Sequence, residues 1–208
     1  MYNPSHFAVT DIGAVHAMIR ENVFATFAAV IEGEIHFAYL PVLLDEDVKP
    51  FGSVHFHCAR ANPLATIEDG TMLKMSIMGA HCYISPDWYE SKDQVPTWNY
   101  TAVEGTGRAK RLSDEETLSY LAKFAFQQEK TLVPKPPWGL EKVDPKRLLQ
   151  LSKGITGFEL AFDQLEGKTK LSQNRAQADI RGAIAALKER GDPASVAVAL
   201  AMQKTSLR

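Results

Sequence analysis

A chain of 208 residues with 45% hydrophobic and 23% charged residues is long enough to bury a substantial core, which excludes a disordered protein. The formal net charge of −2 argues against a strongly basic nucleic-acid-binding protein, and no run of eighteen apolar residues exists to cross a membrane. The opening MYNPSHFAVTD lacks the basic and apolar regions of a secretion signal, and Cys58 and Cys82 have no CxxC spacing. We therefore expect a globular protein in a reducing cytoplasm.

The first 110 residues favour strands over helices. Apolar runs and apolar–polar alternation predict strands over residues 23–30, 35–44, 53–59, 71–77, 81–84 and 100–110. Between the first two, Glu32-Gly33 predicts a hairpin turn. A short helix is expected from Asn62, a suitable N-cap ahead of Pro63, to Gly70. Strands this close together in sequence pair in antiparallel fashion.

The second half of the chain adds helices. A capping-box pattern begins a helix at Ser113, and further helices are expected over 146–151, 175–190 and 193–204. One more strand is predicted over 155–165. The fold class is therefore mainly β with α (α+β), an antiparallel barrel or sandwich with helices packed outside.

The stretch from residue 81 to residue 100 contains five of the nineteen aromatic residues and two of the three tryptophans. Aromatic rings have a large apolar surface, and leaving this surface exposed to water is energetically unfavourable. The stretch therefore either packs into the core as a rigid corner or forms a wall of an aromatic pocket or partner surface. Taken alone, the segment favours packing.

Arg60 lies between a predicted strand and the helix expected at Asn62. A helix start next to a guanidinium favours anions, so a phosphate contact is one interpretation and a simple ion pair is the other. His55 and His57 alternate onto one face of their strand. They either line a ligand cavity, bind a metal together with a residue such as His81, or lie on a half-exposed strand face.

The segment from Lys168 to Asn174 offers two ammonium groups, a hydroxyl and two amides just ahead of the predicted helix at Arg175. This composition suits an anion site at a helix start, and capping of the helix by Ser172 or Asn174 is expected in either case. The chain contains no Walker loop, GxGxxG, HExxH or nucleophile elbow.

Five segments together resemble the PaiB-type FMN-binding negative transcriptional regulators, and the resemblance extends from residue 1 to about residue 180. The segments are MYNPSHF at the start, GSVHFHCARANP (52–63), MGAHCYISPDWY (78–89), VPTWNY (95–100) and LEGKTKLSQN (165–174). The resemblance implies a split β-barrel that forms a homodimer with FMN between its subunits. We expect residues 1–165 to form the split-barrel domain and residues 166–208 a C-terminal motif and helical tail packed on it, one structural domain overall.

The resemblance also implies which residues bind FMN. Arg60 would approach the phosphate, and the strand with His55 and His57 would run beside the flavin. The loop of Trp98, Asn99 and Tyr100 would help to close the site, from the same chain or from the partner. The family's tail motif adds three candidates without an assigned contact: Lys168, Lys170 and Ser172.

The sequence departs from the family pattern at two places. Ala38-Tyr39 precede Leu40-Pro41 where the family commonly has Thr-His, which affects the residue above the flavin ring. Phe56 replaces the usual glycine between His55 and His57. Because side chains alternate along a strand, Phe56 should point away from both histidines and leave their cavity intact.

Two functions remain open, with a third outside the resemblance. The leading one is a cytoplasmic, dimeric FMN-binding regulator of transcription. It would act directly or indirectly, since neither a helix-turn-helix signature nor a basic stripe accompanies it. The alternative is an FMN-dependent oxidoreductase or flavin reductase acting on a small molecule. The third is a metal site of His55, His57 and His81 in a cupin-like barrel.

Overall fold

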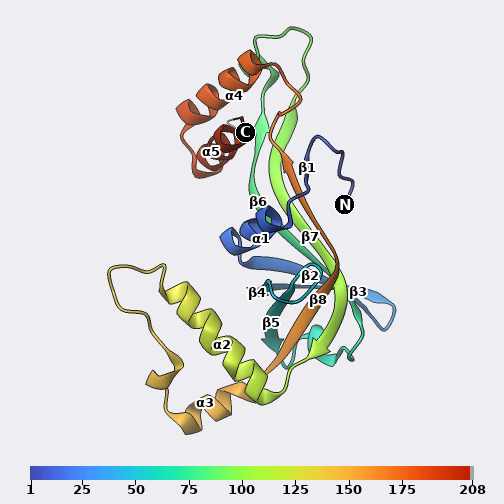
Figure 1. Cartoon of the computed structure of the whole chain (residues 1–208), viewed down its shortest axis with the longest axis vertical. Coiled ribbons are helices and arrows are strands. Elements are labelled where there is room, and N and C mark those ends of the chain that lie inside the picture. Colours follow the sequence, from blue (N-terminus) through green and yellow to red (C-terminus); the bar gives the residue numbers. More distant parts are fainter. Residues whose placement is uncertain (207–208) are drawn as a thin grey trace. The chain divides into compact units, whose positions relative to one another are not determined.

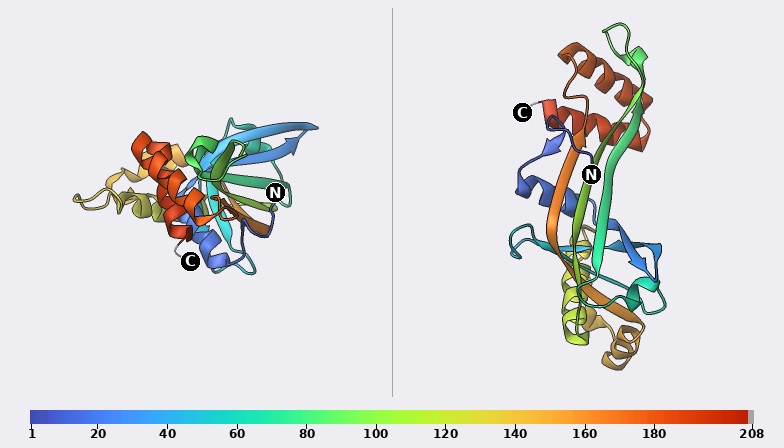
Figure 2. Two further views of the ribbon diagram at one scale, coloured as in Figure 1. Left: turned by 90° about the horizontal axis from the view of Figure 1, so that it is seen from above. Right: turned by 90° about the vertical axis from the view of Figure 1, so that its right-hand side faces the viewer.

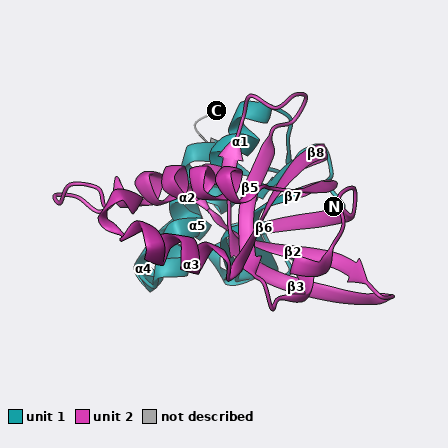
Figure 3. Ribbon diagram, turned by 90° about the horizontal axis from the view of Figure 1, so that it is seen from below, with its two compact units in different colours: residues 1–18, 77–104, 166–208 teal, residues 19–76, 105–165 magenta. Residues whose placement is uncertain are grey.

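The computed structural model describes residues 1–206, which form two compact units (Figure 3). Unit 1 comprises residues 1–18, 77–104 and the chain from 166 onwards, and unit 2 comprises residues 19–76 and 105–165. None of the helices in residues 1–206 is long and apolar enough to span a membrane.

A mainly antiparallel sheet of eight strands is the framework of the fold (Figure 1). Its strands follow the order β3-β2-β6-β7-β8-β5-β4, and β1 pairs with β8. The strands are β1 (Ala8–Val9), β2 (Phe24–Ile31), β3 (Glu34–Pro41), β4 (Leu43–Asp45), β5 (Ser53–Ala59), β6 (Met72–Ile84), β7 (Thr97–Arg111) and β8 (Ile155–Lys170).

In unit 2, β2 and β3 form the predicted hairpin (blue in Figure 2). Glu32 and Gly33 both have positive φ, 52° and 85°, as a tight hairpin turn requires, so the prediction of a turn at this dipeptide is confirmed. On the other side, β5 pairs with β8 in register from Ser53↔Ala161 to Ala59↔Ile155. In addition, β3 lies against β5, which curls the strands of unit 2 around a common core.

Stacked phenylalanines form the centre of this core. The Phe56 ring lies 4.1 Å from the Phe27 ring and 5.5 Å from the Phe158 ring, measured between centroids. Val54, Leu73, Met75 and Leu160 are also buried. Phe56 is fully buried on the face opposite His55 and His57, so the expectation that it points away from both histidines is confirmed.

Two helices and two short 3-10 turns complete unit 2: α2 (Asp114–Glu129), α3 (Pro145–Ser152), η1 (Pro63–Thr66) and η3 (Leu140–Lys142). The predicted capping box begins α2, since the Ser113 hydroxyl accepts from Glu116 N and the Glu116 carboxylate accepts from Ser113 N. Asn62 caps η1 as predicted. However, η1 ends at Thr66 because Ile67 is extended, so the predicted helix to Gly70 was wrong.

In unit 1, helices α4 (Gln177–Arg190) and α5 (Pro193–Ser206) pack against β6 and share its core (Figure 1). Cys82 and Ile84 of β6 contribute to this core together with Ala183 and Leu187 of α4 and Val198 of α5. The turn η2 (Pro86–Trp88) follows β6, and the helix α1 (Ile12–Glu21) begins within this unit. The Asp179 carboxylate accepts 2.9 Å hydrogen bonds from Glu90 N and Ser91 N, which holds the loop after η2 against α4.

Other boundaries also differ from the sequence prediction. The strand expected over 35–44 is divided at Val42 into β3 and β4, because β3 pairs with β2 and β4 pairs with β5. The strands expected at 71–77 and 81–84 are one strand, β6, because Met78–Ala80 continue the extended backbone. Strand β8 extends to Lys170 instead of ending at residue 165, and its last part pairs with β1. Helix α4 begins at Gln177 after Ala176, without a side-chain cap, so capping by Ser172 or Asn174 was wrong.

Candidate functional site

The structure places the residues predicted to bind the cofactor in two groups. Those in unit 2 are His55, His57 and Arg60, on or just after β5. Those in unit 1 lie on β7, at the end of β8 and just after it: Trp98, Asn99, Tyr100, Lys168, Lys170 and Ser172.

His55 and His57 share one face of β5 and lie against Tyr120 of α2. The ring centroids are 6.0 Å apart for His55 and Tyr120 and 5.8 Å apart for His57 and Tyr120. The Tyr120 hydroxyl and His57 Nδ1 form a 3.2 Å hydrogen bond. Burial lowers the pKa of His57 and raises the pKa of Tyr120, so both groups are neutral near pH 7. This pair can bind a polar group without adding charge to the site.

The lowered pKa of His57 predicts a pH dependence of stability. Below pH 6.5, the ordinary pKa of histidine, the unfolded chain takes up a proton that folded His57 does not, so the free energy of unfolding falls. The fall ends once the pH drops below the pKa of the folded state. Its size is about 1.4 kcal/mol for each unit by which the pKa is lowered. Urea unfolding between about pH 5 and pH 8 measures this fall.

In His57→Gln the corresponding part of the pH dependence should disappear, because glutamine has no titrating group. The matched control is His81→Gln, which replaces an exposed histidine. Equal pH profiles for wild type and His57→Gln would contradict the prediction.

Arg60 extends from the end of β5 and is exposed. Its Nη2 donates a 3.2 Å hydrogen bond to the carbonyl oxygen of Ile155, and the side chain lines a cavity of about 200 Å³. The helix start expected beside it is only the four-residue turn η1, which is too short to provide the dipole of a full helix. Any anion site at Arg60 therefore depends on side chains.

A second cavity of about 740 Å³ lies between β4, β5 and α2, and His55 and Tyr120 line it. Its rim is strongly acidic, since six carboxylates face one lysine, Lys123. The six are Asp45, Glu46, Asp47, Glu115, Glu116 and Glu159. Like charges repel, so this cavity disfavours a phosphate group.

Trp98 of β7 belongs to an exposed aromatic cluster in unit 1. Its side chain is 53% exposed, and its ring lies 6.4 Å from the rings of both His81 and Tyr83 on β6. We name Trp98, His81 and Tyr83 the Trp98 cluster. Of the two interpretations of the aromatic stretch, the Trp98 cluster fits a surface, whereas buried Tyr89 packs into the core.

Asn99 and Ser172 form a buried hydrogen-bond pair. Asn99 is fully buried, and its Nδ2 donates to the Ser172 hydroxyl at 3.0 Å, while this hydroxyl lies 3.2 Å from Asn99 Oδ1. Ser172 has a positive φ of 66°, which turns the chain at the end of β8. Nearby, Lys170 Nζ donates to the Thr97 hydroxyl at 2.6 Å. These contacts hold the end of β8 and the turn after it against β7.

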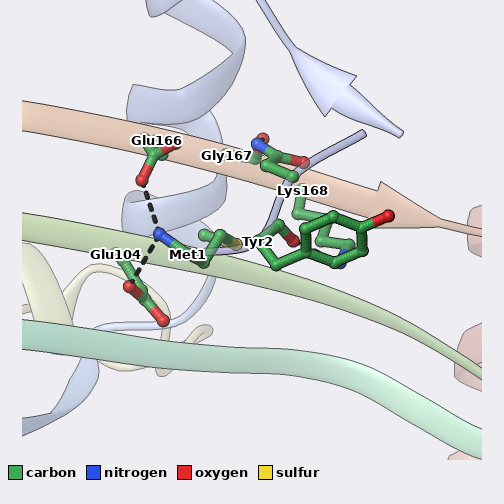
Figure 4. A network of polar contacts seen from close by, with 7 residues as sticks. Met1, Tyr2, Glu104, Glu166, Gly167 and Lys168 are labelled. Carbon is green, nitrogen blue, oxygen red and sulfur yellow. Dashed lines mark hydrogen bonds and ion pairs between the residues drawn. The ribbon is translucent and has the colours of Figure 1, made fainter. Parts of the chain in front are cut away.

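Lys168 lies in a network around the first residues of the chain (Figure 4). Lys168 is 95% buried as a residue, and its ammonium group donates to the Tyr2 carbonyl oxygen at 2.8 Å and lies 5.2 Å from the centre of the Tyr100 ring. The Met1 ammonium group pairs with Glu166 at 2.7 Å and with Glu104 at 3.2 Å. A buried ammonium group without a carboxylate of its own still has capacity for an anionic partner.

An apolar face is exposed on the β2–β3 hairpin of unit 2. Because the register pairs Thr26 with Tyr39 and Ala28 with Phe37, alternate residues of both strands point to the same side. This side is more than 60% exposed at each of its large residues, Phe24, Val30, Ile35, Phe37 and Tyr39. We name these five residues the hairpin face.

Residues 1–206 contain no group of three or more His, Cys, Asp or Glu side chains that could hold a metal ion. His55 and His57 belong to unit 2, and His81 belongs to unit 1. Both cysteines are buried and free, and burial raises the pKa of each thiol to about 11.

Sequence reasoning missed three residues near the candidate site: Tyr120, Arg111 and Thr156. Tyr120 had a usable signal, because it follows the capping box at a position that faces the core side of α2. Arg111 and Thr156 had none, since they approach Arg60 only through the pairing of β5 with β8 and the folding of β7.

The fold and the residues in it define a flavin-binding split barrel, and residues 1–164 match the family model described as "Putative FMN-binding domain". The chain belongs to this FMN-binding family, and FMN is the cofactor of the family. This agrees with the resemblance seen in the sequence segments.

Among individual proteins, the chain is 32% identical over 194 residues to the "Protease synthase and sporulation protein PAI 2" of Bacillus subtilis, covering 93% of this chain and 92% of that protein. The FAD and heme binding protein of Mycobacterium smegmatis has a similar fold, with a TM-score of 0.59, 14% identity, and coverage of 84% of this chain and 78% of that one. The conserved hypothetical protein Rv2991 of Mycobacterium tuberculosis gives a TM-score of 0.56 at 10% identity, covering 85% of this chain and 95% of that one.

The residues present fit FMN, which needs a positively charged binding site for its phosphate and an apolar or aromatic surface for its ring. Within unit 2, Arg60 uses one of its five N–H groups inside the chain and keeps the others for an anion. Within unit 1, considered by itself, the exposed rings of the Trp98 cluster offer stacking surface. Thr156 is one of the residues around the Arg60 cavity, and its hydroxyl is buried without a hydrogen-bond partner. Such a group is destabilising unless a ligand or water satisfies it.

Proposed function

We propose that this protein is a cytoplasmic homodimer that binds FMN between its subunits and regulates transcription, directly or indirectly. The observation that carries the proposal is the pair of exposed apolar surfaces, the hairpin face and the Trp98 cluster. Contiguous apolar patches on a folded protein mark binding sites, and both lie in a protein of a flavin-binding family. A second copy of the chain covers apolar surface that would otherwise face water.

Individual residues have distinct parts in this proposal. Arg60 binds the phosphate of FMN, and His55 and His57 lie beside the flavin. Trp98 and Tyr100 close the site with their rings, and Lys168 and Lys170 add positive charge near it. Asn99 and Ser172 do not contact the flavin themselves. Their buried hydrogen bonds hold in place the backbone segments that carry Trp98 and Lys170.

The regulatory part of the proposal draws on the Bacillus relative, whose name connects that protein with protease synthesis and sporulation. Direct reading of DNA has little support in the charge distribution. Residues 166–208 carry eight Lys and Arg against four Asp and Glu, and these charges alternate in sign. An indirect effect, in which flavin binding alters contacts with a partner, is the form of regulation that fits best.

A second candidate function is that of an FMN-dependent oxidoreductase or flavin reductase. The hydrogen bond between His57 and Tyr120 favours it, because these two groups can hold or pass a proton beside a cavity. When bound, FMN supplies a ring that accepts and returns electrons, while the protein supplies binding and orientation.

The test is a flavin titration of the purified protein by fluorescence quenching, with sedimentation velocity on the same samples. We expect saturable binding of FMN at micromolar concentration or below, a dimer mass, and weaker binding in Arg60→Ala. Absence of FMN binding by the wild type would overturn the proposal. Steady consumption of a nicotinamide nucleotide with FMN turnover would favour the enzyme, whereas specific retention of DNA would favour a direct regulator.

A further inference from the structure

Helix α3 packs poorly within its own chain. Six of its eight residues are exposed, among them Leu149 and Leu151, which are 54% and 53% exposed. Ser152 is its one buried residue, and Leu148 is half-buried. A helix this short is marginal in water and owes its stability to the packing of its apolar side. Another surface is therefore needed to cover α3.

The segment that precedes α3 is equally open. None of the residues from 121 to 151, all of which the structure describes, is buried. Leu132 and Val133, in the connector between α2 and α3, are 52% and 80% exposed. Apolar surface of this extent on a folded protein marks an interaction site.

The hairpin face is the other exposed apolar surface of unit 2, and it lies far from α3 within that unit. In Figure 3 the hairpin of β2 and β3 and the connector before α3 are at opposite ends of unit 2, drawn in magenta. Helix α3 therefore does not cover the hairpin face of its own chain. A contact between these two surfaces requires two copies.

The two surfaces carry opposite charges. Lys146 and Arg147 are exposed in the first turn of α3, whereas Glu32 and Glu34 are exposed at the tip of the hairpin. Positive charge is unfavourable at the start of a helix, because the macrodipole is positive there. The two basic side chains thus gain from an acidic surface placed beside them.

This charge pattern selects one way of joining two copies. Contact between two hairpin faces would bring the acidic tips together, and contact between two α3 helices would bring the basic side chains together, so both arrangements are repulsive. Contact of α3 with the hairpin face of a second copy pairs opposite charges and covers two apolar surfaces at once. Under a two-fold axis the same contact forms twice and the assembly closes as a dimer.

The surfaces are large enough for a stable dimer. A buried aromatic side chain removes about 150–250 Å² from water, so the hairpin face, with three aromatic and two aliphatic side chains each more than 60% exposed, can bury roughly 500 Å². With a similar area from α3 and its connector, two such contacts bury roughly 2,000 Å² over both copies. Stable protein interfaces bury about 1,200–2,000 Å².

We infer that α3 of one copy packs on the hairpin face of a second copy, with Lys146 and Arg147 beside the acidic hairpin tip of that copy. The inference rests on the proposed homodimer and deepens it by naming the segments that join the copies. Neither surface includes a residue assigned to the flavin, so association and FMN binding can be measured separately.

The experiment measures the dimer dissociation constant of the full chain by sedimentation velocity over a dilution series. The double substitutions Lys146→Glu with Arg147→Glu, and Glu32→Lys with Glu34→Lys, should each raise this constant at least tenfold, because each places like charges in both contacts. An equal mixture of the two variants restores opposite charges in both contacts. We expect it to form a heterodimer with a dissociation constant within about threefold of wild type.

The control is Glu68→Lys with Glu189→Lys. Both glutamates are exposed and lie outside the two surfaces, and the change in net charge equals that of the hairpin variant. The dissociation constant should therefore stay within about twofold of wild type. Circular dichroism of every variant checks that the fold is intact, which is expected because only exposed side chains are replaced.

Each outcome decides the matter. If both double variants dimerise as wild type does, the contact between α3 and the hairpin face is overturned, while the homodimer and FMN binding, followed by fluorescence quenching in the same samples, stand. If both variants are weakened and their mixture is not restored, the two surfaces do not meet and the inference is overturned. A monomeric wild type overturns the inference together with the homodimer. Restoration in the mixture alone supports it.

Discussion

Phe56→Ala should lower the free energy of unfolding of unit 2 by about 3–5 kcal/mol. The Phe56 ring is fully buried between Phe27 and Phe158, and its removal leaves a void that these two rings cannot fill without leaving their own contacts. Urea unfolding followed by circular dichroism at fixed protein concentration measures the change. Fixed concentration matters because the proposed dimer would gain stability by association.

Phe126→Ala is the control for this substitution. Phe126 lies on α2 in the same unit, is 48% exposed and contacts the ammonium group of Lys130. The same change of side chain should therefore lower stability by about 1 kcal/mol or less. Similar losses in the two variants would show that Phe56 does not occupy the core position described above.

Gly182→Ala should destabilise unit 1 by about 1–3 kcal/mol, or more if the helix cannot move. A Cβ atom at Gly182 on α4 would overlap the carbonyl oxygen of Trp88 in η2. Because backbone atoms are involved, the overlap cannot be relieved by a change of rotamer. The expected result is a lower unfolding midpoint with an altered tryptophan fluorescence spectrum, since Trp88 must shift.

Gly13→Ala provides a comparison with the opposite sign. Gly13 on α1 is exposed, and a Cβ atom there would lie no closer than 3.5 Å to its nearest neighbour, the Asp11 carboxylate. Alanine should therefore stabilise this position by about 0.4–1 kcal/mol through the unfolded chain. If Gly182→Ala were as well tolerated as Gly13→Ala, the close approach of α4 to η2 would be wrong.

Local signals in the sequence predict much of this fold. The alternation of His55, Phe56 and His57 predicted both β5 and the direction of each side chain, because strand geometry alone sets them. The pairing of Ser113 with Glu116 predicted the start of α2, since both hydrogen bonds are local. Glu32-Gly33 likewise determined the hairpin through its backbone conformation.

The features that the sequence did not predict depend on contacts between residues that are far apart in the chain. Strand β8 continues through polar Lys168 and Lys170 because β1, far away in sequence, pairs with it there. Asn174 and Ser172 look like helix caps, but the Ser172 hydroxyl is used by Asn99 instead. Arg111 and Thr156 line the cavity beside Arg60 only through the pairing and folding of distant strands, which no local pattern in the sequence reveals.

The pairing of β1 with β8 also has a consequence for the order in which the two units fold during synthesis. Ala8 pairs with Lys168, so a strand translated before unit 2 cannot form these hydrogen bonds until a strand that follows most of unit 2 has been translated. Unit 2 lies entirely between these points, at residues 19–76 and 105–165, and its strands can associate while the chain is still growing. Closing so long a loop is entropically unfavourable and slow, so unit 1 should become ordered after unit 2.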